Sequence, residues 1–322
     1  MGNRLIYIDA LRGFAMLLVI VGHLIQFNYS TGIENPIFNI IYSFHMPLFF
    51  FISGCSRSIS ESAKGGIKSI KKLIQFYWKS FISLIIPALS WTYIVPLFFT
   101  NKVEFPQFKF WFLEVLFVIM IIWGGYSLLY NKMGRKTWIT YLFIATITAA
   151  FIIGIKRIPI MYLIMFIFGY YFQSNNWLCR INHHIFSILG IVFLLTVGYF
   201  SYSINGIESV QRVWLEFPLS IIASVCLTRL FYNIDASSNH QHLQPFAYIG
   251  SKTIGIYLCH FFFLNLSVLI TSIESIKSSI IQFSLLLIIA LGISYICIII
   301  ENIIKRFELL SGILYGKWIV SK

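Results

Sequence analysis

Charged residues are scarce in this sequence. Asp, Glu, Lys and Arg together make up 11% of the 322 residues, whereas an ordinary soluble domain carries about 25%. So few charges cannot cover a surface that faces water, which excludes a soluble enzyme and a disordered chain. With 58% hydrophobic residues, the composition predicts a protein that crosses a membrane several times.

The cysteines show no disulfide or metal-binding pattern. There are five of them, with no CxxC pair and no spacing typical of metal ligands. Each lies in or beside an apolar run, where a free cysteine behaves as a small hydrophobic side chain. We therefore expect no metal site.

The formal net charge of +13 does not indicate a nucleic-acid partner, because the cations stand between apolar runs. Their distribution instead predicts topology. If alternate connections are assigned to one side together with both termini, that side holds 18 of the 24 Lys and Arg residues. The positive-inside rule then places both termini in the cytoplasm of a multi-pass inner or plasma membrane protein.

Ten stretches are free of Asp, Glu, Lys and Arg, and most approach the roughly 20 residues needed to span a bilayer. The eighth is short and needs flanking residues on both sides. We therefore predict an all-α integral membrane protein of about ten transmembrane helices, over residues 13–33, 35–56, 80–101, 115–131, 137–155, 158–179, 181–207, 217–228, 253–273 and 278–300.

The connections leave no room for a separate soluble domain, so residues 1–322 are expected to form one transmembrane domain. The Ser- and Lys-rich connection at 57–72 is typical of an interfacial segment that lies against anionic headgroups of membrane lipids. The connection at 233–251 is expected to be a flexible cytoplasmic loop.

The first span carries ionisable residues in one register. From Arg12 to His23 is eleven residues, which on a helix is about 20° of net rotation and roughly 16 Å of rise. Arg12 either binds a ligand or only extends to the interface beside the span. His23 either packs against a neighbouring helix or transfers protons in a cavity. Asp9 either caps the helix or pairs with Arg12.

Other polar residues are predicted at middle to outer depth. His45 lies in the second span, His260 and Asn265 lie in the ninth, and Trp111 and Glu114 open the fourth. Each alone fits a structural role as well as a catalytic one. Their convergence at a similar depth indicates a functional site, because ionisable residues within a membrane are costly.

Four stretches of the chain resemble the acyltransferase 3 family of integral-membrane O-acyltransferases. The first two are the more specific. The stretches are D-A-L-R-G at 9–13 followed by V-G-H at 21–23, F-H-M-P-L-F-F-F-I-S-G at 44–54, W-F-L at 111–113 with L-F at 116–117, and I-G at 249–250 through T-I-G-I-Y at 253–257 to His260.

This resemblance implies an acyl-CoA donor from the cytoplasm, usually acetyl-CoA, as a co-substrate rather than a permanently bound cofactor. It also implies an acceptor hydroxyl on a cell-surface or lipid-linked saccharide, with Arg12 helping to bind the donor and His23 acting in catalysis. The family commonly has an Arg-x-x-Arg pair before a proline in the third span. Here those positions are Ser80 and Ser83, so either the neighbouring Lys79 substitutes for the pair or the donor phosphates are held differently.

The hypothesis that follows is acyl transfer in a helix-lined cavity, with His23 as general base. His45, Asn265 or His260 would stabilise the oxyanion, and Lys79 would hold donor phosphates at the cytoplasmic mouth. Transfer is either direct or through an acyl-histidine. The alternative function is a saccharide or lipid transporter or flippase that uses the same cavity without making a bond.

Overall fold

The computed structural model describes residues 5–95, 110–134, 136–153, 157–181, 183–203, 209–237 and 240–316. These residues form helices and connections and include no strand, which confirms an all-helical chain in this part. The end of the third predicted span, at 96–101, lies outside the described residues. Contacts divide the chain into two compact units.

The first unit comprises Met1–Ser60 and Ile160–Cys297. A short 3-10 turn at Gly32–Glu34 joins its first two helices, and another at His260–Phe263 follows the helix that ends at Cys259. Its helices are α1 (Ile6–Asn28), most of α2 (Pro36–Lys64), α7 (Arg157–Ser174), α8 (Trp177–Arg180), α9 (His183–Ser203), α10 (Ser209–Ala236), α11 (His240–Ser251), α12 (Thr253–Cys259), α13 (Ser267–Glu274) and most of α14 (Ser279–Ile304).

The second unit comprises Glu61–Pro159 and Ile298–Lys322. One long helical segment of this unit covers Ile70–Ile94. It consists, in order, of α3 (Ile70–Ser80), a π-helical turn at Phe81–Ile85, α4 (Ile86–Leu89) and a second π-helical turn at Ser90–Ile94. The other helices of this unit are α5 (Trp111–Lys132), α6 (Thr137–Ile153) and α15 (Glu308–Tyr315).

Six helices in the described residues are long and apolar enough to cross a membrane: α1, α2, the segment Ile70–Ile94, α5, the part of α10 from Phe217, and α14. The other predicted spans correspond to shorter apolar helices within α6, α7 and α9 and to the segment Thr253–Phe263. The eighth charge-free run, which is too short to span a bilayer alone, is extended by helical residues on both sides within α10, as predicted. The count of ten spans and the cytoplasmic position of both termini stay predictions.

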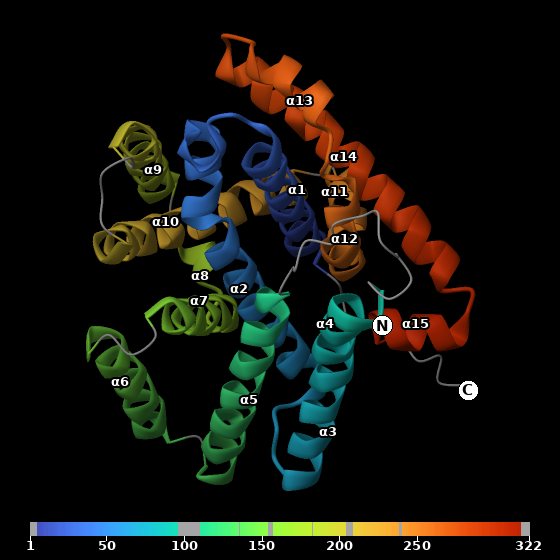
Figure 1. The fold of residues 1–322 in the computed structure, drawn as a ribbon. Coiled ribbons are helices and arrows are strands. Elements are labelled where there is room, and N and C mark those ends of the chain that lie inside the picture. The colour runs from blue at the N-terminus through green and yellow to red at the C-terminus, as the bar shows by residue number, and fades with distance from the viewer. Residues whose placement is uncertain are drawn as a thin grey trace. The chain divides into compact units, whose positions relative to one another are not determined.

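Helix α1 is the buried centre of the first unit, and it packs along α11 and α10 (Figure 1). The close approach of α1 and α11 depends on two glycines. A Cβ atom at Gly13 would overlap the carbonyl oxygen of Phe246, and one at Gly250 would overlap the carbonyl oxygen of Asp9. Only glycine leaves room for backbone on backbone at these two points.

The prediction of a flexible loop at 233–251 is wrong. Helix α10 continues to Ala236, and α11 occupies His240–Ser251. Leu243 and Ile249 of α11 are buried, and the helix lies against α1. Polar composition suggested a loop, but the apolar side chains that recur along this stretch form one buried face.

The ninth predicted span, 253–273, is not one continuous helix. It consists of α12, the 3-10 turn at His260–Phe263, a non-helical link at 264–266, and α13. The backbone groups freed by the break are bonded by Asn28 of α1. Its side-chain nitrogen donates to the carbonyl oxygen of Leu264 (2.9 Å), and its oxygen accepts from the amide of Leu266 (3.1 Å). A break inside a membrane needs such partners because lipid offers none.

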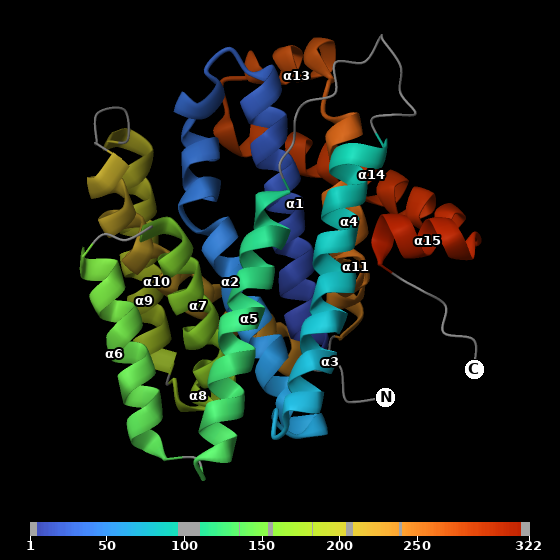
Figure 2. The same ribbon diagram turned by 60° about the horizontal axis from the view of Figure 1, so that its bottom comes forward.

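Much of the connection at 57–72, predicted as an interfacial amphipathic segment, is helical. Helix α2 runs on to Lys64, and Glu61 near its end accepts hydrogen bonds from Trp123 (3.1 Å) and Ser127 (3.5 Å). Helix α3 begins at Ile70, ten residues before the charge-free run, with the Ser69 hydroxyl accepting from the amide of Lys72 (3.3 Å). Helices α3 and α5 lie side by side in the second unit (Figures 1 and 2).

Candidate active site

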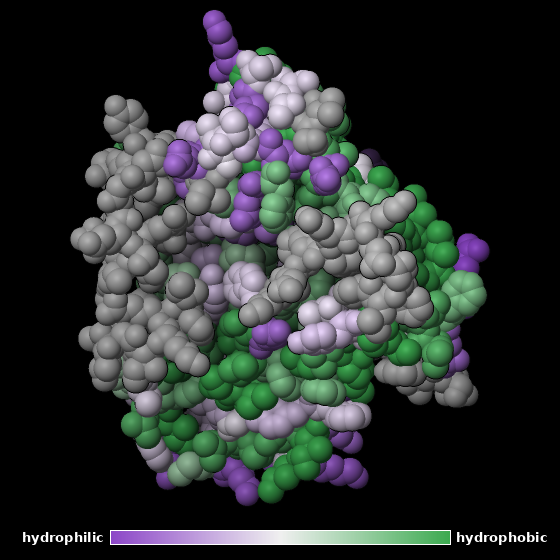
Figure 3. Space-filling view, viewed as in Figure 1, coloured by the Kyte–Doolittle hydropathy of each residue, from purple (hydrophilic) through white to green (hydrophobic). Residues whose placement is uncertain are grey.

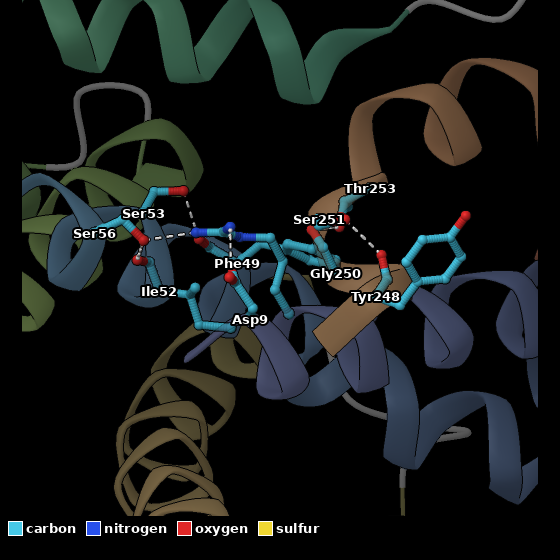
Figure 4. Close-up of polar contacts among 10 residues, drawn as sticks. Asp9, Phe49, Ile52, Ser53, Ser56, Tyr248, Gly250, Ser251 and Thr253 are labelled. Atoms are coloured by element: carbon cyan, nitrogen blue, oxygen red, sulfur yellow. Dashed lines mark hydrogen bonds and ion pairs between the residues drawn. The ribbon is translucent and has the colours of Figure 1, made fainter. Parts of the chain in front are cut away.

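Arg12 of α1 makes polar contacts with its own helix and with α2. Its Nη1 atom lies 3.0 Å from Oδ1 of Asp9, and its Nη2 atom donates to the Ser56 hydroxyl at 2.6 Å (Figure 4). Asp9 is buried, with 6% of its surface exposed, and lies in the first turn of α1. Asp9 is therefore a partner of Arg12.

Ser56 and Ser53 belong to the same face of α2. Each hydroxyl donates to a carbonyl oxygen one turn earlier, Ser56 to Ile52 and Ser53 to Phe49, both at 2.8 Å. The Ser56 oxygen is thereby oriented to accept from Arg12. Figure 4 shows this cluster near the junction of α11 and α12, where Thr253 donates to the carbonyl oxygen of Gly250 at 2.7 Å.

His23 stands at the other end of α1 in a closed triangle of polar contacts. Its Nδ1 atom lies 3.1 Å from Oε1 of Gln26 and 3.2 Å from the hydroxyl of Tyr42, which itself donates to Oε1 of Gln26 at 3.0 Å. An amide oxygen can only accept, so Nδ1 carries the proton in the neutral ring. No hydrogen bond within the described residues occupies Nε2, which is left as a proton acceptor.

Two further histidines lie beside this triangle. The ring of His260 stacks on that of His23 with centroids 5.5 Å apart. The ring of His45 lies 4.6 Å from that of Tyr42. Both are buried, at 0% and 3% exposure. The structure therefore brings together three of the predicted site residues, from α1, α2 and the turn after α12.

His45 and His260 are oriented alike. In each ring Nδ1 faces the carbonyl oxygen four residues earlier, Ile41 at 2.8 Å and Ile256 at 3.1 Å, so Nδ1 donates. Nε2 of each neutral ring is then an acceptor. Nε2 of His260 is fully buried without a hydrogen-bond partner in the described part of the chain. Among the described residues, no group of three or more His, Cys, Asp or Glu side chains is arranged to hold a metal ion.

The broken segment that carries His260 is also tied to α1 at its far end. Glu274, which closes α13, accepts from the amide (3.0 Å) and hydroxyl (2.6 Å) of Ser30 and from the amide of Thr31 (3.3 Å). Burial alone would raise the pKa of Glu274, but these hydrogen bonds outweigh it and lower the pKa. Asn28 and Glu274 together fix the chain on either side of the break.

The remaining predicted site residues are Asn265 in the first unit and three residues of the second unit. Asn265 lies exposed in the link at 264–266 and makes no hydrogen bond to the three histidines within the described residues. Lys79, Trp111 and Glu114 are exposed residues of the second unit. Their placement in one site with Arg12 and His23 stays a prediction.

The sequence interpretation missed the residues that hold the site together: Gln26, Asn28, Tyr42 and Ser56. A signal existed for two of them. Gln26 follows His23 by three residues and Tyr42 precedes His45 by three, so each shares a helical face with a histidine. Nothing in the sequence pairs Ser56 with Arg12 across 44 residues, and nothing assigns Asn28 to a break 236 residues away.

Comparison with known proteins gives a family match over nearly the whole chain. The model of an acyltransferase domain, acyltransferase 3, matches residues 5–299. The nodulation protein NolL of Mesorhizobium japonicum is 34% identical over 97 residues, which are 29% of this chain and 24% of that protein. The nodulation protein NolL of Sinorhizobium fredii is 45% identical over 56 residues, 16% of this chain and 15% of that protein.

These aligned segments span about a quarter or less of the curated relatives' length. No solved structure matches the chain.

Proposed function

The chain belongs to the acyltransferase 3 family, and we propose that it transfers an acetyl group from acyl-CoA to a hydroxyl of a cell-surface or lipid-linked saccharide. The family supports an acyltransferase, and the apolar helices support a multi-pass membrane protein. The donor, the acceptor and an inner or plasma membrane location belong to the proposal.

The observation that carries the proposal is the protonation pattern of His23. Gln26 and Tyr42 occupy Nδ1, so Nε2 of the neutral ring is available as a base. Nε2 removes the proton of the acceptor hydroxyl while the oxygen attacks the thioester carbonyl. The tetrahedral intermediate then collapses to the ester and CoA thiolate, and the thiolate takes the proton back from the imidazolium. Atoms and charges balance without a cofactor.

Arg12 is proposed to bind the donor. It lies roughly 16 Å along α1 from His23, so CoA phosphates near Arg12 would place the pantetheine arm along the helix toward the base. Asp9 and Ser56 fix the guanidinium in one orientation, which lowers the entropy lost on binding. Lys79 remains the proposed second cation.

His45 and His260 suit the acceptor better than the oxyanion. With Nδ1 of each donating to a backbone carbonyl, the neutral rings offer acceptors at Nε2. The hydroxyl groups of a saccharide are donors that match them, whereas an oxyanion needs a donor. We propose that these two histidines orient the saccharide beside His23.

The proposal is tested with purified protein in detergent, acetyl-CoA and candidate glycans, by measuring release of free CoA thiol. Glycan-dependent release that is lost in His23→Ala supports the enzyme. His184→Ala is the matched control, because His184 is an exposed histidine of α9 in the same unit. Equal loss in both variants, or release that His23→Ala leaves intact, contradicts the proposal.

The broken segment α12–α13 supports a second candidate, a saccharide or lipid transporter or flippase, because discontinuous helices line the sites of many transporters. Glycan flux into vesicles that survives His23→Ala, without CoA release, would favour this function. Incubation with labelled acetyl-CoA alone separates two routes of the enzyme: labelled protein indicates an acyl-histidine, and unlabelled protein indicates direct transfer.

A further inference from the structure

Exposed lysines gather at one end of the α3–α5 pair in the second unit. At this end the side-chain nitrogen of Asn131 donates to the carbonyl oxygen of Ile67 at 3.2 Å, which joins the start of α3 to the end of α5. Six exposed lysines stand within five residues of Ile67 or Asn131 in the sequence and form what we call the lysine cluster: Lys64, Lys68, Lys71, Lys72, Lys132 and Lys136.

The lysine cluster has little neutralising charge of its own. None of the six lysines forms an ion pair within the described residues. The nearby carboxylate of Glu61 is half-buried and bonded to Trp123. In Figure 3, hydrophilic atoms gather at the lower edge, where α3 begins and α5 ends. This end of the unit is therefore a concentrated positive surface.

An apolar groove begins one turn beyond the lysine cluster. Its volume is about 370 Å³, and it is lined by Ile74, Tyr77, Trp78, Phe81, Phe117 and Ile121. Ile74 and Trp78 are each 61% exposed. The Tyr77 hydroxyl donates its proton to the carbonyl oxygen of Ile121 at 2.8 Å. It therefore has no second proton to offer a ligand, and the other lining side chains are apolar.

The groove and the lysines follow the same helical faces. One face of α3 carries Lys71, Ile74 and Trp78, which are spaced by three and four residues. The same line continues three residues further to Phe81, in the π-helical turn that follows α3. On α5, Ile121 and Lys132 are eleven residues apart, so they too share a face. A ligand with an anionic group at the lysines would therefore have its apolar part in the groove.

We propose that this surface binds one molecule of an anionic phospholipid, with its phosphate at Lys68, Lys71 and Lys132 and one acyl chain in the groove. Both helices belong to candidate membrane spans, so acyl chains are the available apolar ligands. The charge selects the headgroup, because basic residues near a membrane surface attract anionic lipid. This site does not depend on the proposed acyl transfer.

The test uses the full chain in nanodiscs and the fluorescence of Trp78. Phospholipids brominated on the acyl chain quench a tryptophan that they touch, and the difference between the wild type and Trp78→Phe isolates the signal of Trp78. We expect this signal to be quenched at least about twofold more by brominated phosphatidylglycerol than by brominated phosphatidylcholine at equal mole fraction. The control is Trp138→Phe, which removes an exposed tryptophan of α6 outside the groove. This variant should keep the stronger quenching by brominated phosphatidylglycerol than by brominated phosphatidylcholine.

The headgroup preference is tested by replacing the lysines. In the triple variant Lys68→Gln, Lys71→Gln and Lys132→Gln, both brominated lipids should quench the fluorescence of Trp78 equally. Lys277→Gln, an exposed lysine of the first unit, should keep the preference. Equal quenching of the wild type by the two lipids overturns the proposal, as does a preference that survives the triple variant. Relief of quenching by added long-chain acyl-CoA assigns the groove to another ligand and also overturns it.

Discussion

The hydroxyl oxygen of Tyr42 lies 3.2 Å from Nδ1 of His23, on a different helix and nineteen residues further along the chain. Gln26 completes the contact, because its Oε1 atom faces both groups. The base proposed for acyl transfer is therefore oriented from α2 as well as from its own helix.

The first prediction concerns these two partners of His23. Tyr42→Phe and Gln26→Leu should each lower kcat by about tenfold, roughly 1.4 kcal/mol, because the ring loses one of the bonds that fix its tautomer. KM for acyl-CoA should hardly change, since neither residue contacts Arg12. Steady-state kinetics with varied acyl-CoA measure both constants. A variant that raises KM alone would show that the triangle binds the donor rather than positioning the base.

The second prediction concerns the ion pair of Arg12. Arg12→Gln removes a cation that pairs with the buried carboxylate of Asp9, so the variant should be less stable by roughly 1–3 kcal/mol. Adding Asp9→Asn should restore most of that stability, because the pair is then neutral. Thermal unfolding in detergent measures this.

The same double variant separates stability from function. If Arg12 binds the donor, Asp9→Asn with Arg12→Gln folds well but keeps a KM for acyl-CoA at least about tenfold above the wild type. Full recovery of KM in the double variant would mean that Arg12 serves the fold alone.

The third prediction concerns the approach of α1 to α11. Gly250→Ala should destabilise the chain by several kcal/mol, on the order of 3, because the new Cβ would overlap the backbone of Asp9. Gly292→Ala is the matched control, since a Cβ there meets nothing within 4 Å. That variant should be neutral or stabilised by about 0.5–1 kcal/mol. Comparable unfolding temperatures for the two alanine variants would contradict the packing described.

The fourth prediction concerns acid stability. The pKa of Glu274 is lowered below its ordinary value of 4.5 in the folded chain, so its carboxylate stabilises the fold. That contribution is complete above pH 4.5 and is lost as the pH falls through the lower, folded-state pKa. Unfolding temperatures measured across this range should fall less steeply for Glu274→Gln than for the wild type. Parallel curves would show that the bonds to Ser30 and Thr31 contribute nothing.

Much of the site was predictable because helical geometry is local. The register of Asp9, Arg12 and His23 on one helix follows from 3.6 residues per turn, and the pairing of Asp9 with Arg12 follows from their spacing. The depth of His45 and His260 was estimated from their positions within apolar runs. In the structure the ring of His260 lies beside that of His23, and the ring of His45 lies beside that of Tyr42.

Hydropathy was a poorer guide to where helices begin, break or continue. It predicted one helix over 253–273 and a loop over 233–251, and both were wrong. Apolar composition reports the solvent that surrounds a segment, not whether its backbone bonds run without interruption. The break is tolerated because Asn28 satisfies the freed backbone groups.

The sequence by itself determined that this chain is helical, that it belongs in a membrane, and that a cation and a histidine share a face of its first helix. Those properties follow from composition and from the geometry of a single helix. Only the tertiary structure decided that Ser56 holds Arg12, that Tyr42 and Gln26 orient His23, and that Asn28 secures the broken segment. Such pairings depend on which helices pack together, and no local rule of spacing contains that information.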